Sequence, residues 1–443
     1  MSAGSTPRRL SVAVLSWNGL HHLKTCLAAL AGQEDPGLPW ELLLLDNGSR
    51  DGTAAWVRAR HPAVRLIESP VNLGFCAGNN RLVEAATGDA VAFLNNDTRP
   101  EPGWLHGLAA ALREAPPDVA AVSGQIVDWD AERLDFARGV MTFDGHAFQL
   151  DFRRPLAAAR IPAAGAELPF ACGGNMLVRR ESFLAAGGFD PDYFAYLEDV
   201  DLGWRLWAGG ERVTFAPGAV ARHRSSATSD LLGPFNRGFL FERNAFLTAC
   251  KNYEEGLWQK VMPAVLMTLL ARTQTLLAEN NPGGGSLRVD PYAGWIADTA
   301  AAACEAPEGE GAPRLTPGRI ADRLAELGPR EALRRAWRRL AAAARGREEE
   351  PPAPTLTDER TVAQLRALNY LVGHLDAAAA KRRAVQARRR RSDREYFERF
   401  PAYLVPTYPG DEHLFARPGF RAWLPPELPL VEARLEEVME REG

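Results

Sequence analysis

The sequence contains little cysteine and no paired cysteine motif. Only five cysteines occur in 443 residues, and no two of them have CxxC spacing. A structural zinc site or a disulfide framework is therefore not expected, and we interpret the cysteines as small buried residues in a reducing compartment. The net charge of −4 gives the chain no general affinity for nucleic acid, so a nucleic-acid-binding function is not expected.

Long apolar segments are also lacking. Residues 1–9 are polar, without the apolar core of a signal peptide, and we expect them to be disordered. The most apolar stretch, residues 261–270, is shorter than the roughly 20 residues that a membrane-spanning helix needs. We therefore expect a cytoplasmic protein, for which peripheral contact with the inner face of the plasma membrane stays open.

The first half of the chain alternates between short apolar runs and segments with helical spacing. Strands are predicted at 11–16, 41–45, 64–67 and 90–94, and further short strands at 120–123, 175–178, 213–216 and 219–222. This order predicts an α/β fold with a mostly parallel, Rossmann-like sheet and flanking helices. In such a sheet, ligands bind at the carboxyl ends of the strands. Residues 128–170 match neither period and are left without an assignment.

From about residue 230 the pattern becomes helical. We expect a domain at 10–250, then an α-helical C-terminal region at 251–443 with mobile linkers near 305–313 and 346–356, which are rich in Glu, Pro and Gly. The segment Lys381–Arg394 carries eight basic residues and one acid. It is either a solvated helix face or a contact with an anionic membrane surface or a phosphate-bearing acceptor.

Two of the predicted strand-end loops could hold a nucleotide. Asp46 ends a strand, and a carboxylate there can accept the ring N–H of uracil or thymine; alternatively, Asp46 and Ser49 cap the next helix. The glycine-rich segment 72–80 allows a backbone to approach a ligand closely, or it is an ordinary loop before a helix. It matches neither the P-loop nor the GxGxxG pattern.

Acidic residues and one histidine are the candidates for chemistry. Asp97 follows an apolar strand, where its carboxylate suits a hard divalent cation that also binds phosphate. Glu198, Asp199 and Asp201 lie within four positions, and crowding of like charges raises a pKa, so that one of them can act as a general base. The alternative for these three is an acidic helix N-terminus. His223 ends a predicted strand and is either a metal ligand or a structural residue.

The order of these segments resembles the family 2 glycosyltransferases, most closely the rhamnosyltransferase and galactofuranosyltransferase-like branch. The segments are Val14–Gly19, Asp46–Thr53, Asn72–Phe75, Leu94–Thr98, Gly187–Asp190, Glu198–Arg205 and His223. The resemblance covers about residues 10–250 and implies a GT-A fold for them. It says little about the chain from residue 280 onward.

The resemblance implies a role for each candidate residue. Asp199 is similar to the family's catalytic base, and Asp97 takes the place of the last acid of its DxD metal motif, whose first acid is Asn95 here. His223 resembles the histidine that completes the metal site in several members. The implied acceptor-side residues are Glu198, Asp201, Gly173 and Gly174. The implied donor-binding residues are Ser16, Trp17, Asn18, Asp46, Asn47, Ser49, Asn72, Gly74, Phe75, Asn79, Asn95 and Asn96.

The resemblance thus implies an inverting enzyme that uses Mg²⁺ or Mn²⁺. Its expected donor is dTDP-rhamnose or a UDP-sugar, and its expected acceptor is a hydroxyl of a cell-envelope or exopolysaccharide precursor, either free or lipid-linked. Two alternatives remain open: a catalytically inactive nucleotide-sugar-binding module, which would be expected to lose Asp97 or Asp199, and a nucleotidyltransferase, which would carry a basic glycine-rich loop near its N-terminus. A processive membrane synthase would need transmembrane helices and a Gln-x-x-Arg-Trp motif, which the sequence lacks.

Overall fold

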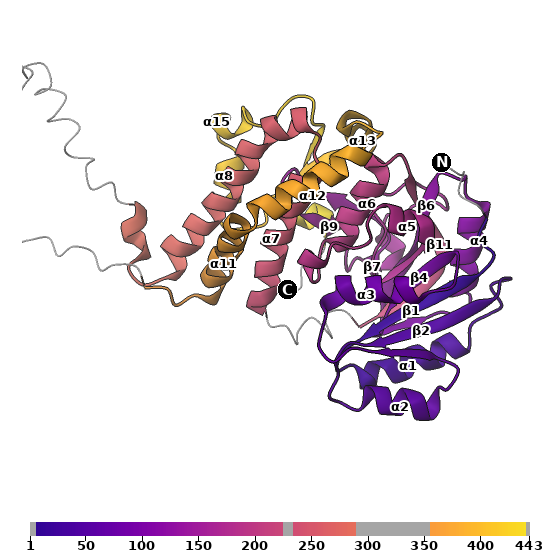
Figure 1. The fold of residues 1–443 in the computed structure, drawn as a ribbon. Helices are drawn as coiled ribbons and strands as arrows, with labels where there is room; N and C mark the ends of the chain where they lie inside the picture. Colours follow the sequence, from indigo (N-terminus) through magenta and orange to yellow (C-terminus); the bar gives the residue numbers. More distant parts are fainter. Residues whose placement is uncertain (1–5, 225–233, 289–354, 440–443) are drawn as a thin grey trace, which may run out of the picture. The chain divides into compact units, whose positions relative to one another are not determined.

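The computed structural model describes residues 6–224, 234–288 and 355–439 (Figure 1). The chain packs as two compact units, one of Met1–Thr273 with Ala363–Gly443 and one of Gln274–Val362. The C-terminal segment from Ala363 therefore packs in the same unit as the N-terminal sheet, across the boundary expected at residue 250. The linker expected near 305–313, nearly all of the one near 346–356, and residues 1–5 of the N-terminus expected to be disordered lie outside the described residues.

The described part of the larger unit contains a nine-stranded sheet in the order β3-β2-β1-β4-β10-β6-β11-β5, with β7 paired to β6. Its strands are β1 (Leu10–Ser16), β2 (Trp40–Asp46), β3 (Arg65–Glu68), β4 (Ala90–Asn95), β5 (Thr98–Pro100), β6 (Val119–Asp128), β7 (Leu134–Phe136), β10 (Asn175–Arg179) and β11 (Arg212–His223). Two small ladders pair β8 (Gly139–Met141) with β9 (Ala147–Gln149), and β12 (Ala402–Leu404) with β13 (Leu430–Glu432).

The sheet has the expected Rossmann-like parallel part and, beside it, antiparallel strands, so that it is mixed. Strands β3, β2, β1 and β4 are parallel to one another, as the alternating pattern predicts. Strand β10 is antiparallel to both β4 and β6, and β5 is antiparallel to β11. The two strands predicted at 213–216 and 219–222 are one strand, β11, whose register along β6 shifts between Ala216 and Val220. Such a bulge breaks the two-residue period, which is why the sequence reads as two strands.

Helices cover both faces of the sheet (Figure 1). Apolar residues of α1, α2 and α4 pack on one face, and those of α3, α5 and α6 pack on the other. The helices of this half are α1 (Leu20–Ala31), α2 (Thr53–Arg60), α3 (Gly74–Ala85), α4 (Trp104–Glu114), α5 (Arg180–Ala185) and α6 (Glu198–Ala208), with short 3-10 turns η1 (Leu156–Ala158) and η2 (Pro191–Tyr193). Central strands buried on both faces explain the uninterrupted apolar runs in the sequence.

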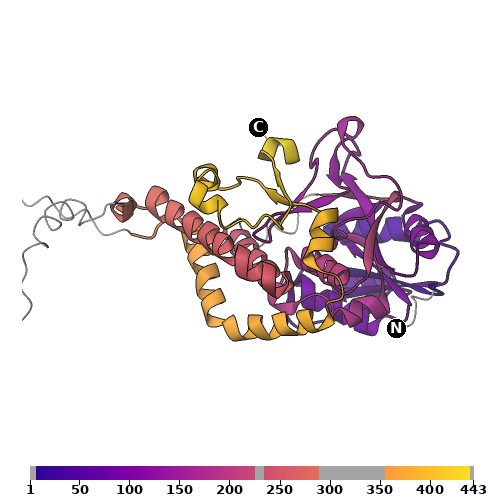
Figure 2. The same cartoon turned by 90° about the horizontal axis from the view of Figure 1, so that it is seen from above.

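The C-terminal half is helical, as the sequence predicts. Its elements are α7 (Pro234–Asn252), α8 (Glu255–Asn280), η4 (Gly284–Arg288), α11 (Glu359–Gly373), α12 (Leu375–Arg388), α13 (Asp393–Arg399), α14 (Asp411–Phe415), α15 (Pro418–Arg421) and α16 (Leu435–Val438). Helix α12 packs against α7, and α13 packs against α6 (Figure 2). In the smaller unit, the side chain of Asn281 bonds to Thr361 Oγ1 and to the backbone N–H groups of Thr357 and Asp358.

The apolar stretch at 261–270 belongs to a longer helix than the sequence suggests. Helix α8 has 26 residues, so by length and composition it could cross a membrane, and the expectation that the stretch is too short is wrong on length. Just over half of its most apolar part, 56%, is buried inside the protein. Leu266, Met267 and Leu270 are exposed on its outer side. A mostly buried apolar helix is also what the core of a soluble protein contains.

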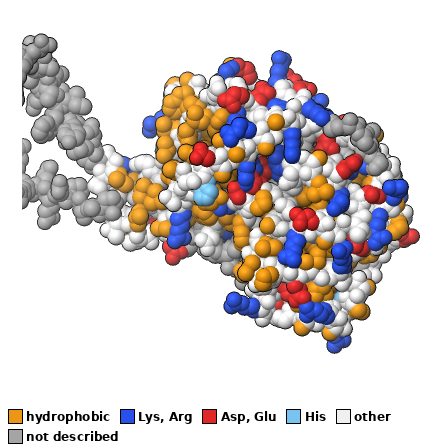
Figure 3. All heavy atoms as spheres, in the orientation of Figure 1, with side chains coloured by type: hydrophobic (Ala, Val, Ile, Leu, Met, Phe, Trp, Pro, Cys, Tyr) orange, Lys and Arg blue, Asp and Glu red, His pale blue; other side chains and the backbone are white. Residues whose placement is uncertain are grey.

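The basic segment Lys381–Arg394 lies against the sheet-bearing half of its unit. Arg391 donates to the carbonyls of Glu211 and Gly210, and its guanidinium lies 5.0 Å from the ring centre of Trp207. Arg382 donates to the carbonyls of Cys250 and Tyr253. These contacts favour a packing role for the segment. Lys and Arg side chains are interspersed with Asp and Glu over the face in Figure 3.

Candidate active site

The strand ends place the predicted site residues along one edge of the sheet. Ser16 pairs with Asp46, and Leu15 pairs with Asn95, so β1, β2 and β4 end at the same level. A cavity of about 760 Å³ opens there. Of the predicted residues, those in its wall are Trp17, Asn47, Asn72, Gly74, Phe75, Asn95, Asn96, Asp97, Gly173, Gly174, Glu198, Asp199 and His223. Residues from seven separate segments thus meet in one cavity, as the resemblance implied.

Asp97, which is buried, and His223, which is partly buried, form a pair in the cavity wall. Antiparallel pairing of β5 with β11 places His223 opposite Thr98, next to Asp97. His223 Nε2 lies 3.4 Å from Asp97 Oδ1, and Nδ1 lies 2.9 Å from Asp135 Oδ2. Burial lowers the pKa of His223, but hydrogen bonds to Asp135 and Asp97 raise it to about 10. Burial raises the pKa of Asp97, but its hydrogen bond with His223 holds it below its usual range.

The donor atoms of this pair suit a divalent cation. A carboxylate oxygen and an imidazole nitrogen are ligands that Mn²⁺ accepts, and Mg²⁺ prefers oxygen. Among residues 6–224, 234–288 and 355–439, no cluster of three or more His, Cys, Asp or Glu side chains is placed to hold a metal. Asp97 and His223 would therefore hold a metal only together with ligands from the substrate, such as phosphate oxygens.

Asp199 and Glu198 begin α6 at the opposite part of the wall. The two oxygens of Asp199 accept hydrogen bonds from the backbone N–H groups of Gly173, at 2.9 Å, and Val200, at 2.8 Å. Burial raises the pKa of Asp199 in spite of these bonds. Burial and the neighbouring Asp199 charge raise the pKa of Glu198 well above its usual range. Of the two, Glu198 therefore holds its proton more strongly, and Asp199 ionises first.

The glycines near the cavity serve the packing of the chain itself. A side chain at Gly74, whose φ is +79°, would lie 2.5 Å from the ring of Phe194. A side chain at Gly174 would lie 2.7 Å from the amide of Asn95. The expectation that the glycine-rich segment makes room for a ligand is thus only partly right, since Gly74 makes room for Phe194. Most of the segment, residues 74–80, is the start of α3, and only residues 72 and 73 precede the helix.

Five of the expected donor-binding residues do not line the cavity, and their side chains hydrogen-bond within the protein. Asp46 Oδ1 accepts from the N–H of Ser49, and the Ser49 hydroxyl accepts from the N–H of Asn18. Ser16 accepts from the Asn96 amide, and Asn79 donates to the carbonyl of Phe75 one turn earlier. These bonds stabilise the strand-end loops, which is the structural alternative for Asp46 and Ser49. Their expected direct contact with a nucleotide stays a prediction.

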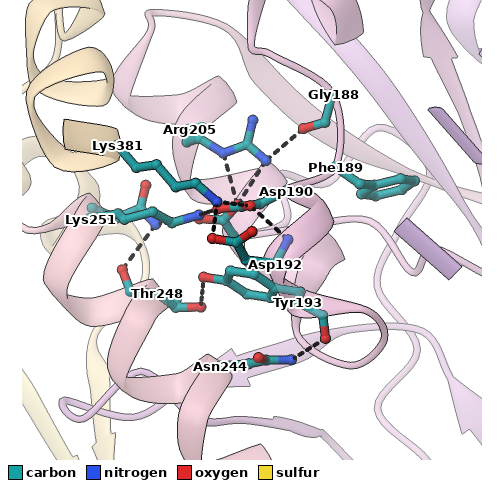
Figure 4. Close-up of polar contacts among 12 residues, drawn as sticks. Gly188, Phe189, Asp190, Asp192, Tyr193, Arg205, Asn244, Thr248, Lys251 and Lys381 are labelled. Atoms are coloured by element: carbon teal, nitrogen blue, oxygen red, sulfur yellow. Dashed lines mark hydrogen bonds and ion pairs between the residues drawn. The ribbon is translucent and has the colours of Figure 1, made fainter. Parts of the chain in front are cut away.

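Asp201 was expected on the acceptor side, and this is wrong. Its fully buried carboxylate pairs with Arg205 at 2.8 Å and with Lys251 at 2.9 Å, away from the cavity. One helical turn separates Asp201 from Arg205, whose guanidinium also donates to the carbonyls of Ala186 and Gly188. Lys251 also binds Asp190, which Lys381 of α12 contacts as well (Figure 4). Asp201 thus belongs to an ion-pair cluster that joins α6, α7 and α12.

Several residues of the cavity wall were not predicted. Residues 135–153 contribute Asp135, His146 and Arg153, and α7 contributes Arg237 and Phe241. The remaining unpredicted wall residues include the aromatic or apolar side chains Phe136, Phe148, Phe152, Phe170, Tyr196 and Met439. No local signal marks them, because residues 128–170 match no secondary-structure period and Met439 lies more than 200 residues away in sequence. They give one part of the cavity an aromatic and basic character.

Comparison with known proteins gives the family. Residues 11–185 match the model of the family described as glycosyl transferase family 2. N-acetylglucosaminyl-diphospho-decaprenol L-rhamnosyltransferase of Mycobacterium tuberculosis is 31% identical over 243 residues, which are 49% of this chain and 77% of that protein. Pre-mycofactocin glycosyltransferase of the same species is 27% identical over 50% of this chain and 44% of that protein.

Similarity to solved structures is more distant. The crystal structure of GalNAc-T7 with UDP, GalNAc and Mn²⁺ is matched with a TM-score of 0.45 and 13% identity, over 59% of this chain and 52% of that one. A likeness at this level says nothing about individual site residues. The identity to the rhamnosyltransferase, together with its coverage, is sufficient to assign the family. The chain belongs to glycosyltransferase family 2, and it is a glycosyltransferase with the GT-A fold.

Proposed function

We propose that this enzyme transfers a sugar from a nucleotide diphosphate sugar to an acceptor hydroxyl with inversion of configuration. The observation that carries the proposal is the shared cavity, which has Asp97 and His223 in its wall together with Asp199. Asp97 and His223 suit the binding of a diphosphate, and Asp199 suits the abstraction of a proton. An inactive binding module has no need for a buried carboxylate with a raised pKa in its cavity, which favours the enzyme.

Asp199 would act as the general base. The N–H groups of Gly173 and Val200 fix the orientation of its carboxylate, so that a bound acceptor hydroxyl can donate its proton to an oxygen of fixed position. The hydroxyl oxygen then attacks the anomeric carbon from the side opposite the nucleotide, and the bond to the diphosphate oxygen breaks. A single displacement of this kind inverts the anomeric configuration.

Asp97 and His223 would hold Mg²⁺ or Mn²⁺, which neutralises the diphosphate as it leaves. Asn95 and Asn96 are near Asp97 in the wall and carry amides that can hydrogen-bond to phosphate or sugar oxygens. The change from an acid to Asn95 removes one negative charge from the site. We expect this change to weaken metal affinity more than it weakens transfer.

The donor side of the cavity would be the end formed by Trp17, Asn47 and Asn72. The Asn47 amide is fixed by the Asn72 side chain and by the Gly74 carbonyl, so these groups are preorganised. The named activity of the rhamnosyltransferase relative makes dTDP-rhamnose the favoured donor and a UDP-sugar the next. The same relative makes a cell-envelope or exopolysaccharide precursor, including a lipid-linked one, the favoured acceptor. Such an acceptor would bring the enzyme to the inner face of the plasma membrane.

The decisive experiment is a nucleotide-sugar panel with purified protein and Mn²⁺. Release of nucleoside diphosphate is measured for dTDP-rhamnose, UDP-galactose, UDP-glucose and GDP-mannose, with and without a polyprenyl-diphosphate-linked acceptor. One donor should be hydrolysed slowly alone and faster with acceptor. A panel without turnover, but with tight binding of one donor, would favour the inactive module. Release of pyrophosphate from a nucleoside triphosphate would favour the nucleotidyltransferase.

A further inference from the structure

The loop that precedes Asp199 has an unusual backbone. Phe194, Tyr196 and Leu197 have φ angles of +62°, +70° and +63°, in the left-handed region. L-residues other than Asn and Asp rarely adopt this region, and large side chains do so only where the surroundings hold them. Leu197 directly precedes α6, so its conformation sets the direction in which Glu198 and Asp199 enter the cavity wall.

One side chain of α7 binds the backbone of this loop three times. The Asn244 amide nitrogen lies 3.1 Å from the carbonyl oxygen of Tyr193, 2.8 Å from that of Ala195 and 2.7 Å from that of Tyr196 (Figure 4 shows the contact with Tyr193). Asn244 is fully buried. The left-handed turns direct these carbonyl groups inward, where no regular secondary structure pairs them. The two N–H groups of Asn244 therefore supply their hydrogen bonds.

Asn244 is itself held by its neighbour in sequence. Its Oδ1 accepts from Nε of Arg243 at 2.9 Å, and Arg243 also donates to the Tyr193 carbonyl at 2.8 Å. The Arg243 guanidinium lies 4.8 Å from the ring centre of Phe239 and 4.6 Å from that of Tyr370 in α11. The clamp on the loop is therefore connected to the C-terminal helices.

Other contacts hold other parts of the loop. The ring of Tyr196 stacks on that of Phe241 in α7, with 4.7 Å between the ring centres. The Phe194 carbonyl accepts from the N–H groups of Phe75 and Cys76 at the start of α3. Lys251 fixes Asp190, which caps η2. None of these contacts involves the carbonyls of Ala195 and Tyr196. These two are the last loop carbonyls before α6 that accept a hydrogen bond from another element. Asn244 donates to both of these carbonyls.

We propose that Asn244 is a positioning residue for catalysis, which holds the 193–197 loop in its left-handed form and so sets the place of the Asp199 carboxylate. The proposal rests on the proposed role of Asp199 as the base. It gives the C-terminal helices a function in the reaction: α7 carries the clamp, and α11 supports it through Tyr370. Asn244 does not line the cavity, so we expect it to act without contact to the substrate.

The test is the variant Asn244→Ala, which removes both N–H donors. We expect kcat to fall at least about tenfold and the donor KM to change by less than about twofold, because donor-binding loops are untouched. Amide hydrogen exchange of the peptide 190–200 should become faster, while that of α1 stays unchanged. Asn244→Asp keeps the size and the oxygen that accepts from Arg243 but cannot donate, so it should lose at least as much activity.

The control is Thr268→Val in α8, which removes a buried hydrogen bond to the Ala264 carbonyl of the same helix. It should lower Tm without lowering kcat. A kcat of Asn244→Ala within twofold of wild type, unchanged exchange of the peptide 190–200, or an equal fall of kcat in the control would each overturn the proposal. If the alanine variant does not fold, Asn244→Ser is measured instead. Serine keeps one hydrogen-bond donor, so its kcat should lie between those of wild type and Asn244→Asp.

The exchange experiment needs no substrate. If the wild-type protein transfers no sugar from any donor, the proposed function fails while the difference in exchange between wild type and Asn244→Ala can still be measured. If the enzyme is active and the variant has normal kcat, only the role of Asn244 fails. The two failures are therefore distinguishable.

Discussion

Asp199 and Asp201 are two positions apart on one helix turn, yet their surroundings give them different chemistry. Asp199 faces the cavity with two backbone N–H groups as partners, whereas Asp201 faces two cationic side chains in the interior. Arg205 and Lys251 hold the pKa of Asp201 below its usual range despite burial, while burial raises the pKa of Asp199. The first residue is suited to take up a proton and the second to remain charged.

Substitution should separate these two acids. Asp199→Asn should lower kcat by about 10²–10⁴-fold, because the amide cannot accept the acceptor's proton, while donor binding persists. Asp201→Asn should instead lower the free energy of unfolding by about 3–5 kcal/mol, because it leaves buried cations without a counter-charge. Turnover of each donor and urea unfolding are measured on both variants. Near-wild-type turnover of Asp199→Asn would refute its role as the base.

The dependence of transfer on a metal can be tested at Asp97. Asp97→Ala should weaken Mn²⁺-dependent donor binding, because it removes the carboxylate that lies 3.4 Å from His223 Nε2 in the wall of the expected diphosphate site. Excess EDTA should abolish transfer by the wild-type enzyme, and Mn²⁺ should restore it. Calorimetric titration with donor, with and without Mn²⁺, measures the effect. Asp118→Asn is the control, since this acid pairs with Arg212 outside the cavity. Full activity in EDTA would show that transfer needs no metal.

At the scale of elements, the sequence predicted the regular part of the sheet and missed its irregular part. The strands from β1 to β4 are short apolar runs that alternate with helices, and their positions along the chain follow from the pattern alone. The antiparallel insertion of β10 between β4 and β6 could not be read from the sequence, because register and neighbours depend on long-range packing. Residues 134–153 contain strands of three residues each, too short to show a period.

The site was predictable for similar reasons. Residues that directly follow predicted strands or begin a predicted helix, such as Asn95, Asp97 and Asp199, were placed in the cavity wall as expected. Asp201, whose predicted place was wrong, lies on the same helix as Asp199. Its carboxylate points to the interior because a cation from a distant segment, Lys251, lies there. Asn244 shows the same limit, since nothing in its own helix reveals that three carbonyls of a distant loop face it.

The packing of α7 against α8 depends on a buried charge cluster beside the cavity. His146 lies 3.1 Å from Asp144 and 3.2 Å from Glu242 of α7, and Arg272 of α8 binds Asp144 at 3.1 Å and Asp411 at 3.0 Å. Burial lowers the pKa of His146, but the charges of Asp144 and Glu242 raise it to about 9. His146 is therefore protonated and part of the ion-pair cluster at neutral pH.

This cluster predicts a pH dependence of stability. A histidine whose pKa is raised from about 6.5 to about 9 on folding stabilises the protein fully below pH 6.5, and this contribution is lost as the pH rises through 9. The variant His146→Gln cannot carry the charge. Urea unfolding should show it less stable than wild type by on the order of 1–3 kcal/mol at pH 6, with a difference that shrinks by pH 9.5. An equal difference at both pH values would show that His146 is neutral in the folded protein.

At the scale of the whole chain, the C-terminal helices belong to the catalytic unit and are not an appendage. Segments from beyond residue 363 supply Tyr370 to the loop clamp, Lys381 to the ion-pair cluster and Met439 to the cavity wall. The side chains of the basic segment that could attract an anionic surface are largely engaged in such contacts. Leu266, Met267 and Leu270 of α8 offer exposed apolar side chains for membrane contact instead.

The basic segment should therefore affect folding more than membrane binding. Arg391→Gln removes two bonds to carbonyls near the C-terminal end of α6 and the contact with Trp207, and it should lower the free energy of unfolding by about 1–3 kcal/mol. Co-sedimentation with phosphatidylglycerol vesicles at low and high salt should be the same for the variant and the wild type. Leu270→Gln on the outer side of α8, where side chains are half exposed, is the matched comparison and should reduce any vesicle binding instead. Each basic residue near an anionic surface contributes about 1 kcal/mol to binding, and salt screens this contribution. Vesicle binding that is strong at low salt, weakens with salt and is lost in Arg391→Gln would therefore show that the segment binds an anionic surface. Its packing contacts would then have to open on binding.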